Sequence, residues 1–239
     1  MFFPPPILVI NQRGDEMYQF FENEVVRNEY STIPYTWIRS EQRNKSICFM
    51  LPGLGYTTQR PLFHYATGIC LHNHVDVLQI NYNFVKNEQF RGLSKEEQDQ
   101  WMYEDVKAVV KAVLKDTYYE QCILLSKSIG TIPMAMEWTG GTFLLNSVGI
   151  WLTPLLKEDK VYQALLETEL PSLCVIGDED HHFVEERLAS FENNPLVRTV
   201  VIQKADHGLE VQGNTSVSIE AMKEIMEQVE VFIKKNKVG

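Results

Sequence analysis

The chain has 239 residues, of which 44% are hydrophobic, with four cysteines and a formal net charge of -10. This length and apolar content suit one domain with a large buried core, whereas the acidic balance makes nucleic acid and anionic membranes poor partners. No stretch reaches membrane-spanning length, the first residues lack the basic and apolar regions of a signal peptide, and no Cys-x-x-Cys pair is present, so we expect a cytoplasmic protein.

The first 45 residues carry the weakest pattern. Ile7–Ile10 and Tyr35–Arg39 are predicted strands at the antiparallel start of a sheet, and the sequence between them is polar and irregular.

A buried strand is predicted at Ser46–Leu51, and it ends in a loop that contains Gly53 and Gly55. An apolar run that leads into a glycine-rich loop suits a place where backbone N–H groups approach a ligand, although a plain turn would carry the same residues. The loop lacks the Gly-x-x-x-x-Gly-Lys-Ser/Thr spacing of a phosphate loop, so nucleotide binding is not indicated.

A helix is predicted over Pro61–Leu71 and a strand over Val75–Ile80. The sequence between them, His72-Asn-His-Val-Asp76, begins like the His-x-His-x-Asp signature of binuclear metallohydrolases. Val77 stands where that signature has another histidine, and the segment precedes its strand, so we expect no catalytic metal there.

After a long polar connection, Asn81–Gly92, the pair Ser94 and Glu97 forms a predicted capping box. The helix that it starts has apolar residues at helical spacing, which fits a crossover helix packed on the sheet.

The next strand, Cys122–Leu125, breaks abruptly into Ser126-Lys-Ser-Ile-Gly130 and then into a predicted helix. A serine hydroxyl attacks carbonyls poorly unless it is held on a sharp turn within reach of a base. Small residues on both sides of Ser128 let the strand and the helix approach closely, so Ser128 is the candidate nucleophile.

Two neighbours of Ser128 have predicted roles. An oxyanion formed by attack on a carbonyl needs N–H donors, which commonly come from the residue after the nucleophile and from the earlier glycine loop, here Ile129 and Leu54. Lys127 could favour an anionic substrate, but a side chain that points into solvent is the simpler expectation.

A further strand, Ser172–Gly177, leads into three carboxylates at positions 178–180. A carboxylate at the end of a parallel strand lies at the sheet edge where ligands bind, and could orient a base there. Asp180 is our first choice and Asp178 the second, while a solvated acidic loop would explain all three.

The last predicted strand, Thr199–Gln203, is followed by His207 on a loop of small residues. An imidazole ordinarily has a near-neutral pKa, so it can take a proton from a serine and return it to a leaving group. His207 is therefore the candidate general base. A helix with apolar residues at helical spacing, from Ile219 to Ile233, is expected to cover one face of the sheet.

Together, these strands, the glycine loop, the serine turn, Gly-x-x-Asp and Asp-His-Gly resemble the α/β-hydrolase superfamily, in the chain order Ser, Asp, His. The resemblance covers about residues 46–233 and is closest to small members without a lid. It implies a mostly parallel, twisted sheet of about eight strands with helices on both faces. Two residues depart from the family pattern, since Pro52 replaces a histidine found in many relatives and Ser126 replaces the first glycine of the turn.

The sequence between the predicted strand Val148–Leu152 and the acid strand has room for one short helix, roughly 156–166, and no large cap domain. The resemblance therefore implies a serine hydrolase that acts on a small ester, thioester or related acyl substrate, with Ser128, His207 and Asp180 as its triad and no cofactor or metal. An acyltransferase or peptidase would share this triad, and a non-catalytic binding protein would share the fold. The oligomeric state is left open.

Overall fold

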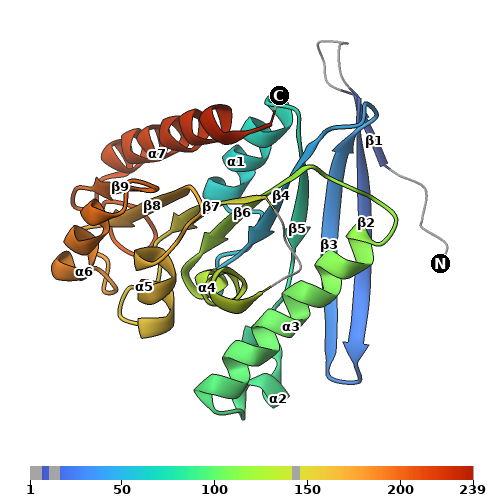
Figure 1. The fold of residues 1–239 in the computed structure, drawn as a ribbon, viewed down its shortest axis with the longest axis horizontal. Coiled ribbons are helices and arrows are strands. Elements are labelled where there is room, and N and C mark those ends of the chain that lie inside the picture. The colour runs from blue at the N-terminus through green and yellow to red at the C-terminus, as the bar shows by residue number, and fades with distance from the viewer. Residues whose placement is uncertain (1–6, 11–16, 142–145, 239) are drawn as a thin grey trace.

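The computed structural model describes residues 7–10, 17–141 and 146–238. The strands in these ranges form one nine-stranded sheet in the order β1-β2-β3-β5-β4-β6-β7-β8-β9 (Figure 1). Their bounds are β1 (Ile7–Ile10), β2 (Met17–Asn28), β3 (Ser31–Ser40), β4 (Ser46–Leu51), β5 (Val75–Ile80), β6 (Gln121–Lys127), β7 (Ser147–Leu152), β8 (Ser172–Gly177) and β9 (Val197–Ile202).

The strand that the sequence did not predict is β2, which occupies part of the supposedly irregular N-terminal region. Its exposed positions alternate with half-buried ones, but polar Asn23 and Arg27 lie on the half-buried side with Phe21 and Val25. A half-buried strand is recognised by the alternation of apolar and polar residues. Because polar and apolar residues share the half-buried face of β2, this alternation is not visible in its sequence. With β1 and β3, this strand forms the antiparallel end of the sheet.

From β5 onward across the sheet, every neighbouring pair of strands is parallel. The carboxyl ends of these strands therefore meet at one edge, where open α/β sheets bind ligands. The predicted glycine loop, serine turn, acid loop and histidine loop follow β4, β6, β8 and β9 respectively, so all four lie at this edge.

Helices cover both faces of the sheet, as predicted. On one face lie α1 (Pro61–His72) and α7 (Thr215–Asn236), and on the other lie α3 (Lys95–Leu114), α4 (Thr131–Gly140) and α5 (Asp159–Leu166) (Figure 1). The remaining helices are short: α2 (Glu88–Arg91), α6 (Glu185–Ser190), and the 3-10 turns η1 (Phe84–Lys86), η2 (Ser128–Gly130) and η3 (Phe191–Asn193).

The central strands are apolar because both of their faces are buried. In β4, Ile47 and Phe49 pack with the α3, α4 and α5 layer, while Cys48 and Met50 pack with α1 and α7. All four side chains are almost completely buried, which explains the continuous apolar run in the sequence.

The predicted capping box is present at the start of α3. The Ser94 side chain accepts a hydrogen bond from the Glu97 N–H, and the Glu97 carboxylate accepts one from the Ser94 N–H. In the described ranges, we find no helix whose length and apolar character would let it cross a membrane.

Candidate active site

The turn after β6 holds Ser128 in a conformation that side chains rarely adopt. Its φ is +53°, in the left-handed region, and its carbonyl accepts a hydrogen bond of 2.6 Å from the Thr131 hydroxyl. Such a backbone costs on the order of 1–3 kcal/mol and persists only where its surroundings impose it. The next helix, α4, begins at Thr131, so its positive N-terminal end lies directly beside the serine.

Close backbone packing explains the small residues around this turn. A Cβ atom on Gly130 would lie 2.2 Å from the carbonyl oxygen of Leu51, and one on Gly53 would lie 3.2 Å from the Ser128 Cβ. The β4 loop therefore lies in close contact with the serine turn, whereas the small residues were expected to let the strand and the following helix approach closely.

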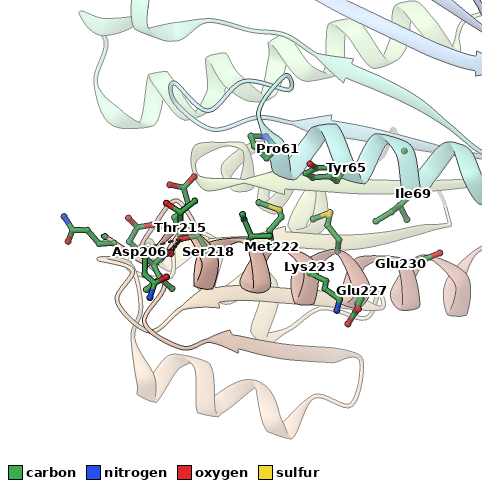
Figure 2. A pocket seen from close by; sticks show the side chains of 18 of the residues that line it. Pro61, Tyr65, Ile69, Asp206, Thr215, Ser218, Met222, Lys223, Glu227 and Glu230 are labelled. Atoms are coloured by element: carbon green, nitrogen blue, oxygen red, sulfur yellow. Dashed lines mark hydrogen bonds between the residues drawn. The ribbon is translucent and has the colours of Figure 1, made fainter.

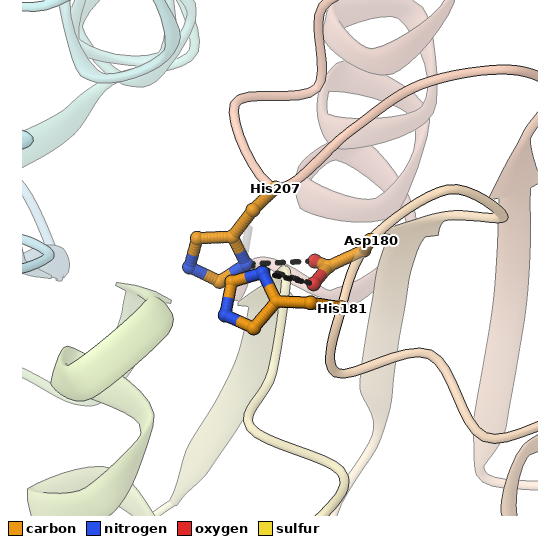
Figure 3. A group of neighbouring side chains, drawn as sticks. All are labelled: Asp180, His181 and His207. Atoms are coloured by element: carbon orange, nitrogen blue, oxygen red, sulfur yellow. Dashed lines mark hydrogen bonds and ion pairs between the residues drawn. The ribbon is translucent and has the colours of Figure 1, made fainter.

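The predicted serine, histidine and aspartate lie in one hydrogen-bonded chain. His207 Nε2 is 2.8 Å from Ser128 Oγ. His207 Nδ1 is 2.8 and 2.9 Å from the two carboxylate oxygens of Asp180 (Figure 3). Three loops that are far apart in the sequence supply the three side chains.

Asp180 is held as a buried carboxylate. Burial alone would raise its pKa, but the hydrogen bond with His207 and a 2.8 Å bond from the His182 N–H outweigh burial and lower the pKa of Asp180 below its ordinary value. A carboxylate only accepts hydrogen bonds, so Nδ1 of His207 carries the proton. Nε2 is then free to accept a hydrogen bond from the Ser128 hydroxyl.

The second candidate, Asp178, has a different partner. Its Oδ1 accepts a hydrogen bond of 2.5 Å from the Lys204 backbone N–H, which tethers the acid loop to the histidine loop. The two loops also touch at Gly177, where a Cβ atom would lie 1.9 Å from the Ala205 carbonyl oxygen. Of the two aspartates, Asp180 is the one that contacts the imidazole.

The two predicted oxyanion residues, Leu54 and Ile129, line the same small cavity of about 110 Å³ beside the serine turn. Its far side is formed by the connection after β5, including Tyr82 and Val85. The Tyr82 hydroxyl donates a 2.6 Å hydrogen bond to the Pro52 carbonyl and so fixes the start of the glycine loop.

The segment between β7 and β8 contains one regular element, α5, and places no large cap over the sheet edge. The His207 side chain keeps about a quarter of its surface exposed (26%), so solvent reaches the base.

The expectation that Lys127 points into solvent is wrong. The residue is only 1% exposed, and its Nζ donates hydrogen bonds to Thr153 Oγ1 at 2.8 Å and to the His207 carbonyl at 2.6 Å. Its ammonium group is therefore not exposed for direct pairing with an anionic substrate. The signal that could have revealed this is its place at the end of a fully buried strand.

Two sets of side chains resemble metal ligands. In the His72-x-His-x-Asp76 segment, the Asp76 carboxylate is buried and accepts hydrogen bonds from Tyr119, Asn44 and the Ser40 N–H, which gives it a structural role. At the sheet edge, Asp180, His181 and His207 each place one potential ligand atom within 4.8 Å of the others (Figure 3). A metal ion bound there would compete with the His207–Asp180 hydrogen bond.

A larger groove, about 1090 Å³, lies between α1 and α7. Tyr65 and Ile69 line it from α1 and Met222 from α7 (Figure 2). Ser128, Asp180 and His207 do not line this groove, so it is separate from the hydrogen-bonded chain described above.

Comparison with known proteins identifies the family to which this architecture belongs. A family model described as an alpha/beta hydrolase domain matches residues 46–234, which is most of the chain. No curated protein matches the sequence.

Several solved structures have a similar fold. An esterase from Pyrococcus furiosus is 14% identical with a TM-score of 0.67, over 91% of this chain and 93% of its own. A dienelactone hydrolase from Anabaena variabilis is also 14% identical with a TM-score of 0.67, over 92% of this chain and 99% of its own. A serine hydrolase without a lid from Xanthomonas campestris is 10% identical with a TM-score of 0.64, over 90% of this chain and 94% of its own. At these identities the likeness concerns the fold alone.

Proposed function

Because this chain belongs to the α/β-hydrolase family, we propose that it is a serine hydrolase in which Ser128 is the nucleophile, His207 the general base and Asp180 the residue that orients the base. The observation that carries the proposal is the continuous hydrogen-bonded chain from Ser128 Oγ through the imidazole to a buried carboxylate. Fold membership alone would not suffice, since the same fold also serves binding proteins.

In the proposed first step, Ser128 Oγ attacks the carbonyl carbon of the substrate while His207 Nε2 takes the hydroxyl proton. The imidazolium that forms is stabilised by the Asp180 carboxylate through the Nδ1 proton. The carbonyl oxygen becomes an oxyanion, and the N–H groups of Leu54 and Ile129, with the N-terminal end of α4, are proposed to stabilise it.

Collapse of this intermediate breaks the bond to the leaving alcohol or thiol, which receives the proton from His207 and departs. Water then attacks the acyl group on Ser128 and gives its proton to His207. When the second intermediate collapses, that proton returns to Ser128 Oγ and the carboxylic acid is released.

The substrate is proposed to be a small or solvent-exposed ester, thioester or related acyl compound. One feature supports this choice: the connection between β7 and β8 carries no large cap over the sheet edge. The esterase and dienelactone hydrolase structures of similar fold agree with this class.

Hydrolysis of a panel of short-chain aryl esters and thioesters tests the proposal. Wild type and Ser126→Ala, which removes a hydroxyl from the same strand, should turn over at least one member of the panel. Ser128→Ala should keep the fold, as judged by circular dichroism, and lose about 10³-fold or more in turnover. Equal activity in Ser128→Ala would refute the assignment, and tight binding without turnover by wild type would favour a binding protein instead.

A further inference from the structure

Lys127 immediately precedes the proposed nucleophile, yet its ammonium group faces away from solvent. It is one of the largest fully buried side chains of the described residues. Besides the hydrogen bonds to Thr153 and His207, its Nζ lies 4.9 Å from the centre of the Tyr56 ring, a distance typical of a cation–π contact.

The three contacts come from three different loops at the sheet edge. Tyr56 belongs to the glycine loop after β4, Thr153 follows β7, and His207 lies in the loop after β9. Thr153 is itself held at a φ of +44°, in the left-handed region, and is completely buried. One side chain thus joins three segments whose relative positions decide the geometry around Ser128.

Burying this ammonium is unfavourable. Burial lowers the pKa of Lys127 to about 8, although the carboxylates of Asp180, Asp206 and Glu210 act in the opposite direction and support the charge. A methionine or leucine of similar size would fill the same space without this cost. We therefore look for the role of the ammonium group in its contacts with neighbouring groups. The shortest of these contacts is with the backbone carbonyl of His207.

We propose that Lys127 is a positioning residue, which holds the backbone of His207 so that the imidazole stays aligned between Ser128 and Asp180. The inference rests on the proposed function for its catalytic consequence, but the alignment itself is a property of the folded protein. Displacement of a catalytic group by about 1 Å can cost on the order of 100-fold in rate, so one hydrogen bond to this backbone carbonyl is enough to matter.

Steady-state kinetics with a short-chain ester is the first half of the test. Lys127→Met keeps the length of the side chain and removes every donor, whereas Lys127→Gln keeps an amide donor without the charge. Lys157→Met, which changes an exposed lysine in the connection between β7 and β8, is the control. Lys127→Met should lower kcat by about 10- to 100-fold with KM nearly unchanged, Lys127→Gln should recover part of the loss, and the control should match wild type.

Nitrogen NMR of the histidine rings is the second half, and it does not depend on activity. In wild type and Lys157→Met, neutral His207 should be a single tautomer protonated at Nδ1, whereas Lys127→Met should show a mixture of tautomers. A wild-type kcat and a single tautomer in Lys127→Met would overturn the inference and leave the proposed function standing. Loss of the single tautomer in Lys127→Met, where wild type hydrolyses no member of the ester and thioester panel, would support the positioning role and count against the proposed function.

Discussion

At the scale of single residues, the candidate site depends on directions of hydrogen bonds as much as on distances. The charged state of Asp180 decides the tautomer of His207, and that tautomer leaves Nε2 able to accept the Ser128 proton. The neighbouring carboxylate, Asp178, has a backbone partner instead. Two aspartates that look equivalent in the sequence are therefore expected to have very different effects on activity.

Substitution of each aspartate by asparagine tests this difference. Asp180→Asn replaces an acceptor by an amide that can donate to Nδ1, which favours the wrong tautomer, and should lower kcat by about 10³- to 10⁴-fold. Asp178→Asn keeps an oxygen that can accept the Lys204 N–H and should retain near-wild-type turnover. The kcat values of the two variants on one ester test which aspartate orients His207. Similar losses of kcat in both variants would contradict the assignment of Asp180.

At the scale of elements, the site is made where loops press against one another. The serine turn contacts the glycine loop at Gly130 and Gly53, and the acid loop contacts the histidine loop at Gly177. At Gly130 and Gly177 the nearest atoms belong to the backbone, so no flexible side chain can move aside to make room there. The close approach of the glycine loop to the serine turn thereby influences where Leu54 lies relative to Ser128.

Gly130→Ala should be both destabilising and inactivating, because its Cβ would overlap the Leu51 carbonyl. We expect a loss of about 1–3 kcal/mol in the free energy of unfolding, measured from urea denaturation. The matched control is Gly68→Ala in α1, where a Cβ would have no atom within 4 Å, and it should gain about 0.5–1 kcal/mol. A stable, active Gly130→Ala protein would show that the close approach is not required.

The sequence predicted these elements unevenly, for physical reasons. Continuous apolar runs such as Ser46–Leu51 and Ser172–Gly177 were recognisable because both faces of those strands are buried. Strand β2 was missed because polar side chains share its inner face. The residues that meet at the sheet edge could be predicted from strand ends alone. The partners of the Lys127 ammonium could not, since they come from three loops that are distant in the chain.

At the scale of the whole molecule, one buried group, the Lys127 ammonium, affects both the stability of the fold and the candidate site. Burial holds the folded-state pKa of Lys127 at about 8, below its ordinary value of 10.5. Below about pH 8, the folded and unfolded chains both hold this proton, and the folded chain bears the full penalty of the buried charge. As pH rises from 8 toward 10.5, the folded protein has released the proton while the unfolded chain still binds it, so this contribution to stability increases with pH.

Urea denaturation of wild type and Lys127→Met at pH 7 and pH 10 isolates this contribution, because all other groups titrate in both proteins. The free energy of unfolding of wild type, relative to that of Lys127→Met, should rise between the two pH values. A difference that does not change with pH would mean that Lys127 has an ordinary pKa in the folded protein.

The central claim is that Ser128 is an activated nucleophile, and covalent labelling tests it most directly. A fluorophosphonate reacts only with a serine that a base has activated, and intact-mass spectrometry counts the adducts. Wild type and Ser126→Ala should each gain one adduct, and Ser128→Ala and His207→Ala should gain none. No adduct on folded wild type, or an adduct that persists in Ser128→Ala, would contradict the account.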